Sequence, residues 1–225
     1  MIYAIPTKKG LGVEIWGTYD DLSNFYNMIS KFWNQENQLN YKGSKNNDKL
    51  ISSFSYEIRK AKEGSRLTRK VNHFTFTEQE YFGTEISWVH FLFSLTALKH
   101  NMRFYETNKL DIAMILQIEF WLEKSMNAYD EVGAKNLAGF IEDGLYGANN
   151  YSYQYMRSIN LDFFQLGGGK RSFRKLPELL KRGIFFTEEY KEYENFLKKE
   201  AQRINCEVED LEIDDDHFDY EKVRW

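Results

Sequence analysis

The sequence contains few residues that would cross-link the chain or interrupt it. Among 225 residues there is one cysteine, Cys206, and there are two prolines. A single cysteine excludes an internal disulfide, so a buried apolar core has to hold the fold together, and a chain of this length can form one. Cytoplasmic proteins typically use cysteine in this way, and we expect a cytoplasmic protein.

Long apolar segments are also missing. The N-terminal sequence MIYAIPTKKG has no positively charged stretch followed by a long apolar one, so we predict no signal peptide. The longest uncharged run near the middle, ISWVHFLFSLTAL at 86–98, has 13 residues, of which four are polar. It is too short for a transmembrane helix, and we expect a soluble protein that does not bind a membrane.

The glycine-rich stretch FFQLGGGKRSFRK, residues 163–175, does not match a nucleotide-binding loop. A Walker A loop needs a first glycine where this chain has Phe164, and a serine or threonine where it has Arg171. A dinucleotide-binding loop needs a third glycine that is absent here. The stretch is therefore interpreted as a flexible connection, and Ser172 is predicted to cap the helix that follows it.

No catalytic or metal-binding motif occurs elsewhere in the sequence. The four histidines are far apart and form no paired zinc motif; they are His73, His90, His100 and His217. The acidic run DDDHFD at 214–219 has no glycine for a calcium loop, no GxSxG motif is present, and Cys206 has no neighbouring base. We therefore predict no catalytic residue, no metal site and no cofactor.

Four acidic residues lie in otherwise apolar segments. Asp111 and Glu119 belong to the run 110–122, in which ten of thirteen residues are apolar, and Glu142 and Asp143 follow in FIEDGLYG. A carboxylate on an apolar helix can be a tuned catalytic group, which keeps an enzyme open as an alternative. Such residues are also typical of helix caps and of internal partners for a cation. The run itself predicts a central helix, because it is apolar on nearly every side.

Charge is distributed unevenly, although the net charge is only -4. Residues 42–71 carry nine cations against three acids, whereas residues 187–225 carry 14 acids against six cations. Such asymmetry is typical of a surface that binds a partner, or of two parts of one molecule that attract each other.

A second basic segment, residues 170–182, has six cations against the single acid Glu178. It forms either a solvated loop and helix that contacts the acidic C-terminal segment, or a binding site for a phosphate, a nucleic acid or another protein. The candidate residues for binding an anion or a partner are Lys170, Arg171, Arg174, Lys175 and Arg182.

The segment LYGANNYSYQY contains four closely spaced tyrosines. Loops rich in tyrosine favour protein recognition, since the ring offers a large rigid contact at low entropic cost. The rings are equally typical of an ordinary core. The candidate protein-recognition residues are Tyr146, Tyr151, Tyr153 and Tyr155.

Periodicity along the chain predicts an α+β fold. Two hairpins, at 2–17 and 70–87, would form a small antiparallel sheet packed on a predominantly helical body. Helices are expected from Thr18, over 48–63, from residue 88 to about 100, and from Thr107 or Asn108 onward. We find no repeat, and we predict one domain over 1–225, with a sheet-containing part at 1–87, a helical part at 88–205 and an acidic tail at 206–225.

Two segments together resemble an uncharacterised bacterial family of the domain-of-unknown-function type. They are IYAIPTKKGLGVEIWGTYDDL near the N-terminus and YFGTEISWVHFLFSLTALK in the middle of the chain. The resemblance implies a cytosolic protein of a bacterium or phage, and it implies no activity.

The absence of a catalytic constellation favours a non-enzymatic module that binds another protein, such as an immunity or defence-related inhibitor. Nucleic-acid binding through the basic segments 42–71 and 170–182 is the alternative, and its affinity would fall steeply with salt. An enzyme with a site scattered through the fold is the third interpretation.

Overall fold

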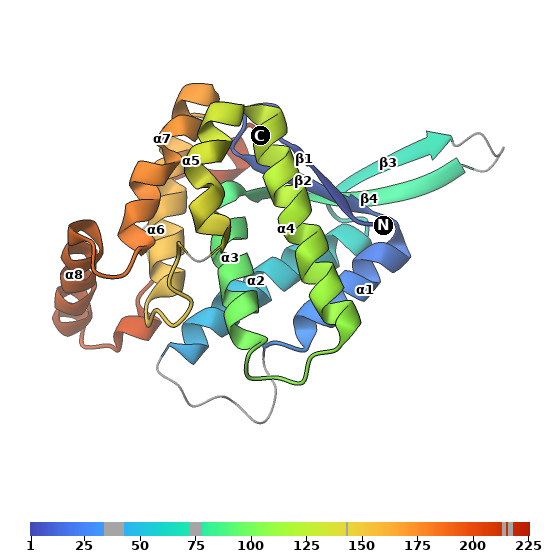
Figure 1. Ribbon diagram of the computed structural model, residues 1–225. Coiled ribbons are helices and arrows are strands. Elements are labelled where there is room, and N and C mark those ends of the chain that lie inside the picture. Colours follow the sequence, from blue (N-terminus) through green and yellow to red (C-terminus); the bar gives the residue numbers. More distant parts are fainter. Residues whose placement is uncertain (34–42, 73–77, 143, 213–214, 216–217) are drawn as a thin grey trace.

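The computed structural model describes residues 1–33, 43–72, 78–142, 144–212, 215 and 218–225 (Figure 1). A four-stranded antiparallel sheet in the order β1-β2-β4-β3 lies beside a larger helical body. Its strands are β1 (Tyr3–Pro6), β2 (Gly12–Gly17), β3 (Leu67–Asn72) and β4 (Glu78–Ser87). Both predicted hairpins are therefore present, and the pairing of β2 with β4 joins them into one sheet. The second hairpin begins at Leu67, before the expected residue 70.

Helices account for most of the remaining chain, which confirms the α+β class. They are α1 (Tyr19–Ser30), α2 (Ser44–Lys62), α3 (Trp88–Asn101), α4 (Lys109–Tyr129), α5 (Glu131–Glu142), α6 (Ser152–Gln165), α7 (Lys170–Leu180) and α8 (Glu188–Ile204). Short 3-10 turns cover Lys181–Gly183, Val208–Asp210 and Tyr220–Lys222. In Figure 1, α8 lies at one end of the molecule, while β3 and the start of β4 extend from the other.

The core forms where one face of the sheet meets α1, α2 and α3. Val13, Ile15 and Ile86 alternate with polar residues along their strands and are almost completely buried. Phe54 of α2 stacks on Phe91 of α3, with ring centroids 5.5 Å apart. Burial of such side chains supplies most of the driving force for folding.

Sequence-encoded caps place the first helices as expected. Thr18 and Asp21 form a capping box at α1. The Thr18 side chain accepts the backbone N–H of Asp21, and the Asp21 side chain accepts the backbone N–H of Thr18. Asn108, one of the two predicted caps, forms the same arrangement with Asp111 at α4. Helix α2 begins at Ser44, earlier than the predicted residue 48, after Gly43 in a left-handed conformation.

The prediction of a central position for α4 is wrong. Ile115, Ile118 and Leu122 are buried, but Leu116 and Phe120 on the same helix are exposed. The helix lies at the surface, where it packs mainly on α5 and β1 (Figure 1). Its broad apolar character therefore reflects a buried face together with a second apolar face that no described residue covers.

The three glycines of the 163–175 stretch form a fixed turn. Gly167, Gly168 and Gly169 all have positive φ, and the Gly169 N–H donates to the carbonyl of Lys9 at 2.7 Å. This bond ties the turn to the β1–β2 hairpin, so the interpretation as a flexible connection is wrong. Ser172 is not the helix cap, since α7 begins at Lys170 and the Ser172 hydroxyl donates back to the carbonyl of Gly168 at 2.8 Å.

Alanine substitution should distinguish two neighbouring glycines in this turn. Gly167→Ala and Gly168→Ala both place a side chain at positive φ, which costs about 1 kcal/mol. A Cβ at Gly168 would also lie 2.7 Å from the backbone oxygen of Lys9, whereas a Cβ at Gly167 meets nothing within 4 Å. Gly168→Ala should therefore lower the free energy of unfolding by at least about 1 kcal/mol more than Gly167→Ala. Urea denaturation measures the difference, and equal effects would contradict the close approach.

Candidate functional site

The basic residues of α7 are divided between internal ion pairs and the surface. Arg174 donates two hydrogen bonds to the buried carboxylate of Asp130, at 2.7 and 2.8 Å. Lys170 lies 3.8 Å from the same carboxylate. These cations, Arg174 foremost, hold the pKa of Asp130 well below its usual range. Arg174 is thus placed to hold α7 against the start of α5.

The remaining cations of this predicted site do not converge on one surface. Arg182 pairs with Asp162 at 2.8 Å and lies over the ring of Tyr193. Arg171 and Lys175 are exposed, and within the described part of the chain neither forms an ion pair. These two residues lie four positions apart on α7 and therefore share one face.

The described part of the acidic C-terminal segment contacts α6 and α2. Asp215 pairs with Arg157 of α6 at 2.5 Å, and Glu209 lies 3.5 Å from Lys45. Lys49 donates to the backbone oxygen of Glu209 at 2.5 Å. Among the described acidic residues of this segment, none pairs with α7, so the expected contact between the acidic tail and the second basic segment is not found there.

The tyrosine cluster is mostly part of the core. Tyr155 is fully buried and donates to the carbonyl of Tyr190 at 2.7 Å, and Tyr151 is buried as well. For these two residues the structure matches the alternative interpretation, an ordinary core. Tyr146 is partly exposed and stacks on Phe185, and Tyr153 lines a cavity of about 640 Å³ between α6 and α8.

The acids considered for catalysis have structural partners. Asp111 is buried, caps α4 and accepts a hydrogen bond from Lys31 at 2.7 Å. Glu119 pairs with Lys99 at 2.6 Å, and Glu142 is exposed. Asp143 lies outside the described residues. Asp111, Glu119 and Glu142 line neither the cavity between α6 and α8 nor a second one of about 750 Å³ beside β4.

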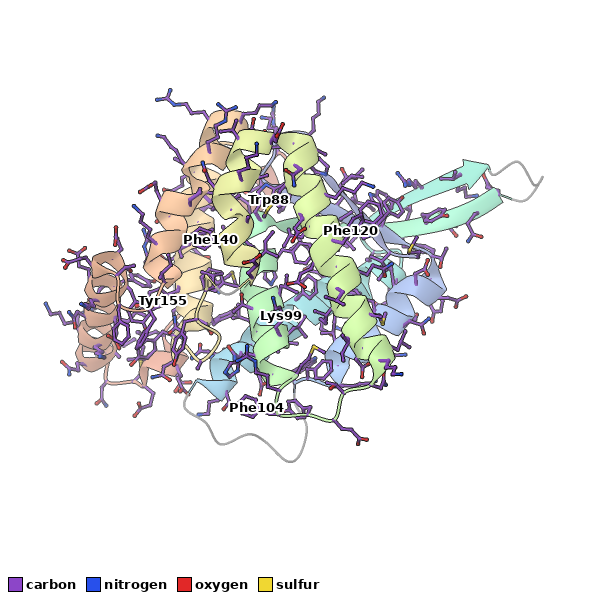
Figure 2. All side chains as sticks on the ribbon, in the orientation of Figure 1. Trp88, Lys99, Phe104, Phe120, Phe140 and Tyr155 are labelled. Atoms are coloured by element: carbon purple, nitrogen blue, oxygen red, sulfur yellow. The ribbon has the colours of Figure 1, made fainter. Side chains whose placement is uncertain are left out.

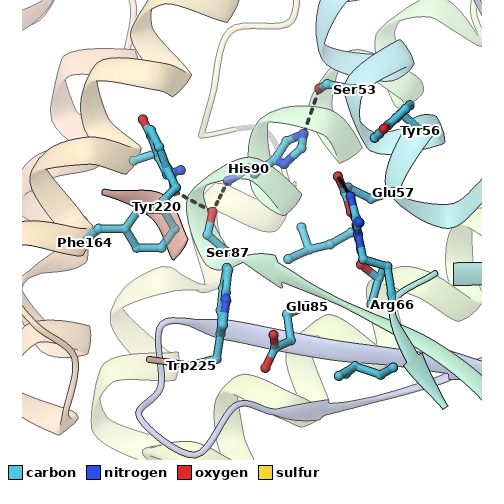
Figure 3. Close-up of a pocket in the computed structure, with 14 residues that line it drawn as sticks. Ser53, Tyr56, Glu57, Arg66, Glu85, Ser87, His90, Phe164, Tyr220 and Trp225 are labelled. Atoms are coloured by element: carbon cyan, nitrogen blue, oxygen red, sulfur yellow. Dashed lines mark hydrogen bonds and ion pairs between the residues drawn. The ribbon is translucent and has the colours of Figure 1, made fainter. Parts of the chain in front are cut away.

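A cleft of about 750 Å³, which we call the β4 cleft, lies at the end of β4 (Figure 3). The last four residues of β4 form its base, and α2, α3, α6 and the C-terminal segment contribute the walls. A volume of this size is typical of sites that bind small molecules or several side chains of a partner. Its residues are Ser53, Tyr56, Glu57, Arg66, Leu67, Thr84, Glu85, Ile86, Ser87, His90, Asn160, Phe164, Tyr220 and Trp225.

The cleft follows a stretch of β4 that is paired on one side only. β4 pairs with β2 as far as Ser87, but its pairing with β3 ends where Gly83 lies opposite Leu67. The Trp88 N–H donates to the Leu11 carbonyl at 3.1 Å, so these two residues form a hydrogen-bonded pair. Hydrogen-bonded and non-hydrogen-bonded pairs alternate along an antiparallel ladder, so Glu85 and Glu14, three positions further along, form a non-hydrogen-bonded pair. The ladder directs the backbone N–H and C=O of Glu85 away from β2, toward the edge where no described strand lies.

The side chain of Glu85 adds a carboxylate to this open edge. Its cross-strand partner is Glu14, so two carboxylates lie on the same face of adjacent strands. Burial raises the pKa of Glu85, and the neighbouring charge of Glu14 raises it further. Neither residue forms an ion pair with a cation in the described part of the chain. The indole N–H of Trp16 donates to Glu14 at 2.9 Å.

A second carboxylate in the cleft is neutralised. Arg66 donates to both oxygens of Glu57, at 2.8 and 3.1 Å, and the Thr84 hydroxyl donates to the same side chain at 3.3 Å. This ion pair lies just before the first residue of β3 and accounts for one cation of the first basic segment. The electrostatic character of the cleft is therefore set by Glu85.

Ser53 and His90 form a hydrogen-bonded pair on another wall (Figure 3). The Ser53 hydroxyl lies 2.9 Å from His90 Nε2 and also donates to the carbonyl of Leu50 at 2.8 Å. The imidazole tautomer decides which of the two side chains donates in this pair. Burial lowers the pKa of His90 to about 4, so the ring is neutral at pH 7.

The opposite wall is aromatic and comes largely from the C-terminus. Phe164 of α6 contacts the rings of Phe218, Tyr220 and Trp225, with centroids 5.5 to 6.4 Å apart. The Tyr220 hydroxyl donates to Asp215 at 2.5 Å, and Asp215 in turn pairs with Arg157. The C-terminal segment is thereby held against α6 and completes the cleft.

Sequence reasoning did not identify Glu85 or Trp225 as site residues. Glu85 takes a polar position in the alternating pattern of β4, which gives no signal of a site, and the point at which the pairing of β4 with β3 stops is not visible in the sequence. Among the described residues, no three histidine, cysteine or acidic side chains are placed to hold a metal ion.

Charge reversal on α7 should separate a structural arginine from an exposed one. Arg174→Glu places an anion beside the buried Asp130 and should lower the midpoint of thermal unfolding markedly. Arg171→Glu, on the exposed face, should leave the midpoint nearly unchanged. Differential scanning calorimetry of both variants tests this, and equal midpoints would contradict the Arg174–Asp130 pair.

The low pKa of His90 predicts a pH dependence of stability. The unfolded chain binds a proton near pH 6.5 and the folded protein only near pH 4, so the stability contributed by this group falls as the pH drops through that interval. The loss is at most about 1.4 kcal/mol per pH unit. Unfolding of wild type and His90→Gln between pH 4 and 7 should show a steeper decline for wild type. Parallel profiles, or an imidazole that titrates near 6.5 by NMR, would refute the assignment.

Comparison with known proteins assigns the chain to a family but to no characterised protein. In the regions that the structure describes, no helix has the length and apolar character needed to cross a bilayer. No curated protein and no solved structure matches the chain. A family model described as a domain of unknown function matches residues 2–225, nearly the whole sequence. The chain therefore belongs to the family DUF6904, a domain of unknown function.

Proposed function

We propose that this protein is a binding module that holds an extended segment of another protein along the open edge of β4. The observation that carries the proposal is Glu85, which offers both its backbone and an unpaired carboxylate to the same cleft. A lysine or arginine of the bound segment would lie beside this carboxylate.

The backbone supplies the general part of the recognition. An extended peptide can add to an exposed sheet edge through main-chain hydrogen bonds, while pockets for alternate side chains give specificity. Glu85 is flanked by Thr84 and Ile86, which bond toward β2, so it provides one donor and one acceptor to an added strand. The cleft of about 750 Å³ leaves room for the side chains of such a segment.

Charge and aromatic character determine which segment fits. The Glu14–Glu85 pair has no cation opposite it among the described residues, and a basic side chain would relieve the repulsion between the two carboxylates. Trp225 and Tyr220 line the same cleft (Figure 3). Aromatic rings stabilise an ammonium or guanidinium group near their faces, so the wall and the carboxylate favour the same partner.

The role of an immunity or defence-related inhibitor, in the cytoplasm of a bacterium or phage-infected cell, belongs to this proposal. A toxin gene beside this one would support that role.

Selection from a phage-displayed library of random linear peptides tests the proposal. The selected peptides should be enriched in lysine or arginine, and Glu85→Gln should weaken their binding by about 10-fold or more, as expected for loss of one partner of a partly buried charge pair. Glu189→Gln, at an exposed position on α8, is the matched control and should bind like wild type. Peptides without basic residues, or equal binding by Glu85→Gln, would contradict the proposal.

Nucleic-acid binding is the second candidate, favoured by the exposed Arg171 and Lys175 on one face of α7. Oligonucleotide binding that falls steeply with salt and is lost in Arg171→Glu/Lys175→Glu would support it. The pairing of Arg66, Arg174 and Arg182 with internal carboxylates leaves fewer cations for this role than the sequence suggests.

A further inference from the structure

The outward face of α4 carries an apolar stripe. Ile112, Leu116 and Phe120 are 48%, 58% and 54% exposed, respectively. Lys109 and Glu123, both exposed, lie at the two ends of the same face, and we call these five residues the α4 stripe. Figure 2 marks the position of Phe120 on α4.

Helix geometry makes these residues one continuous surface. At about 100° per residue, all five positions fall within about 40° of the direction of Leu116. The buried residues Ile115, Ile118 and Leu122 point to the other side, toward the rest of the protein. The stripe is therefore separate from the contacts that hold α4 in the fold, and no described residue covers it.

The stripe has the same spacing when read from either end. From Lys109 the intervals are three, four, four and three residues, so Leu116 lies at its centre. A second copy of the helix packed antiparallel would place Leu116 opposite Leu116 and Ile112 opposite Phe120. The same arrangement places each Lys109 opposite Glu123 of the other copy, which forms two ion pairs related by a two-fold axis.

Charge selects this arrangement over the parallel one. Parallel packing would place Lys109 beside Lys109 and Glu123 beside Glu123, which is unfavourable at both ends. Within the described residues, neither Lys109 nor Glu123 has an ion-pair partner of its own. A helix that lies on a membrane surface has cations along both borders of its apolar face, whereas this stripe ends in the acid Glu123 and has Glu119, which is paired with Lys99, along one border.

We propose that the protein forms a two-fold symmetric dimer by antiparallel packing of the α4 stripe on a second copy of itself. No residue of α4 lines the β4 cleft, so the dimer does not depend on the proposed peptide binding. Since one helix pair forms a small interface, we expect a dissociation constant on the order of 10 µM.

Sedimentation velocity over a concentration series tests the proposal on the full chain. Wild type should change from monomer to dimer between about 1 and 100 µM. Leu116→Lys places two like charges at the two-fold axis and should leave a monomer. The side chain is exposed, so thermal unfolding of this variant should match that of wild type.

A charge exchange tests the antiparallel register. Lys109→Glu alone and Glu123→Lys alone should each weaken the dimer by about 10-fold, because each sets like charges opposite each other at both ends. The double variant Lys109→Glu/Glu123→Lys restores opposite charges and should return the dissociation constant to within about 3-fold of wild type. Failure of the double variant to recover would overturn the register.

Cross-linking provides an independent measurement. In a Cys206→Ser background, Leu116→Cys should oxidise to a covalent dimer, because the two positions meet at the axis. Ala128→Cys, exposed on α4 but outside the stripe, should remain monomeric under the same conditions. A wild-type protein that stays monomeric to about 100 µM would overturn the proposal. So would binding of wild type, but not Leu116→Lys, to phosphatidylglycerol vesicles without dimerisation.

Discussion

The fold depends on a junction between strand and helix that contains no loop. Ser87 is the last residue of β4 and also the N-cap of α3, where its hydroxyl accepts the His90 N–H at 3.0 Å. The next residue, Trp88, donates from its backbone to Leu11 and from its indole to Gly10, and its ring lies against Phe173 of α7. One turn of chain thus joins the sheet, the buried helix α3 and the basic helix α7.

The same junction fixes the proposed binding site. Glu85 lies two residues before Ser87, and His90 lies three residues after it, so the base of the β4 cleft and one of its walls are parts of one connection. A binding site on rigid elements loses little entropy when it is occupied. The edge at Glu85 is open because β3 starts opposite Gly83, whereas β4 continues to Ser87, where α3 begins.

Features encoded within a few residues could be predicted from the sequence, and features that depend on distant pairing could not. The hairpins, the capping box at Thr18 and the helix after Asn108 follow from local patterns. The Arg174–Asp130 pair joins residues 44 positions apart, so the sequence did not show that this cation of the basic segment is used in an internal ion pair. The α4 run looked central because its buried and exposed faces are both apolar, and composition does not separate the two.

Amide hydrogen exchange at Glu85 tests the central claim most directly. Thr84 and Ile86 bond to β2, whereas the Glu85 N–H faces an edge without a strand. In the free protein Glu85 should exchange much faster than both neighbours, and it should become protected when a selected peptide is bound. Equal protection of all three amides in the free protein would contradict the account, since β4 would then have no open edge for a partner.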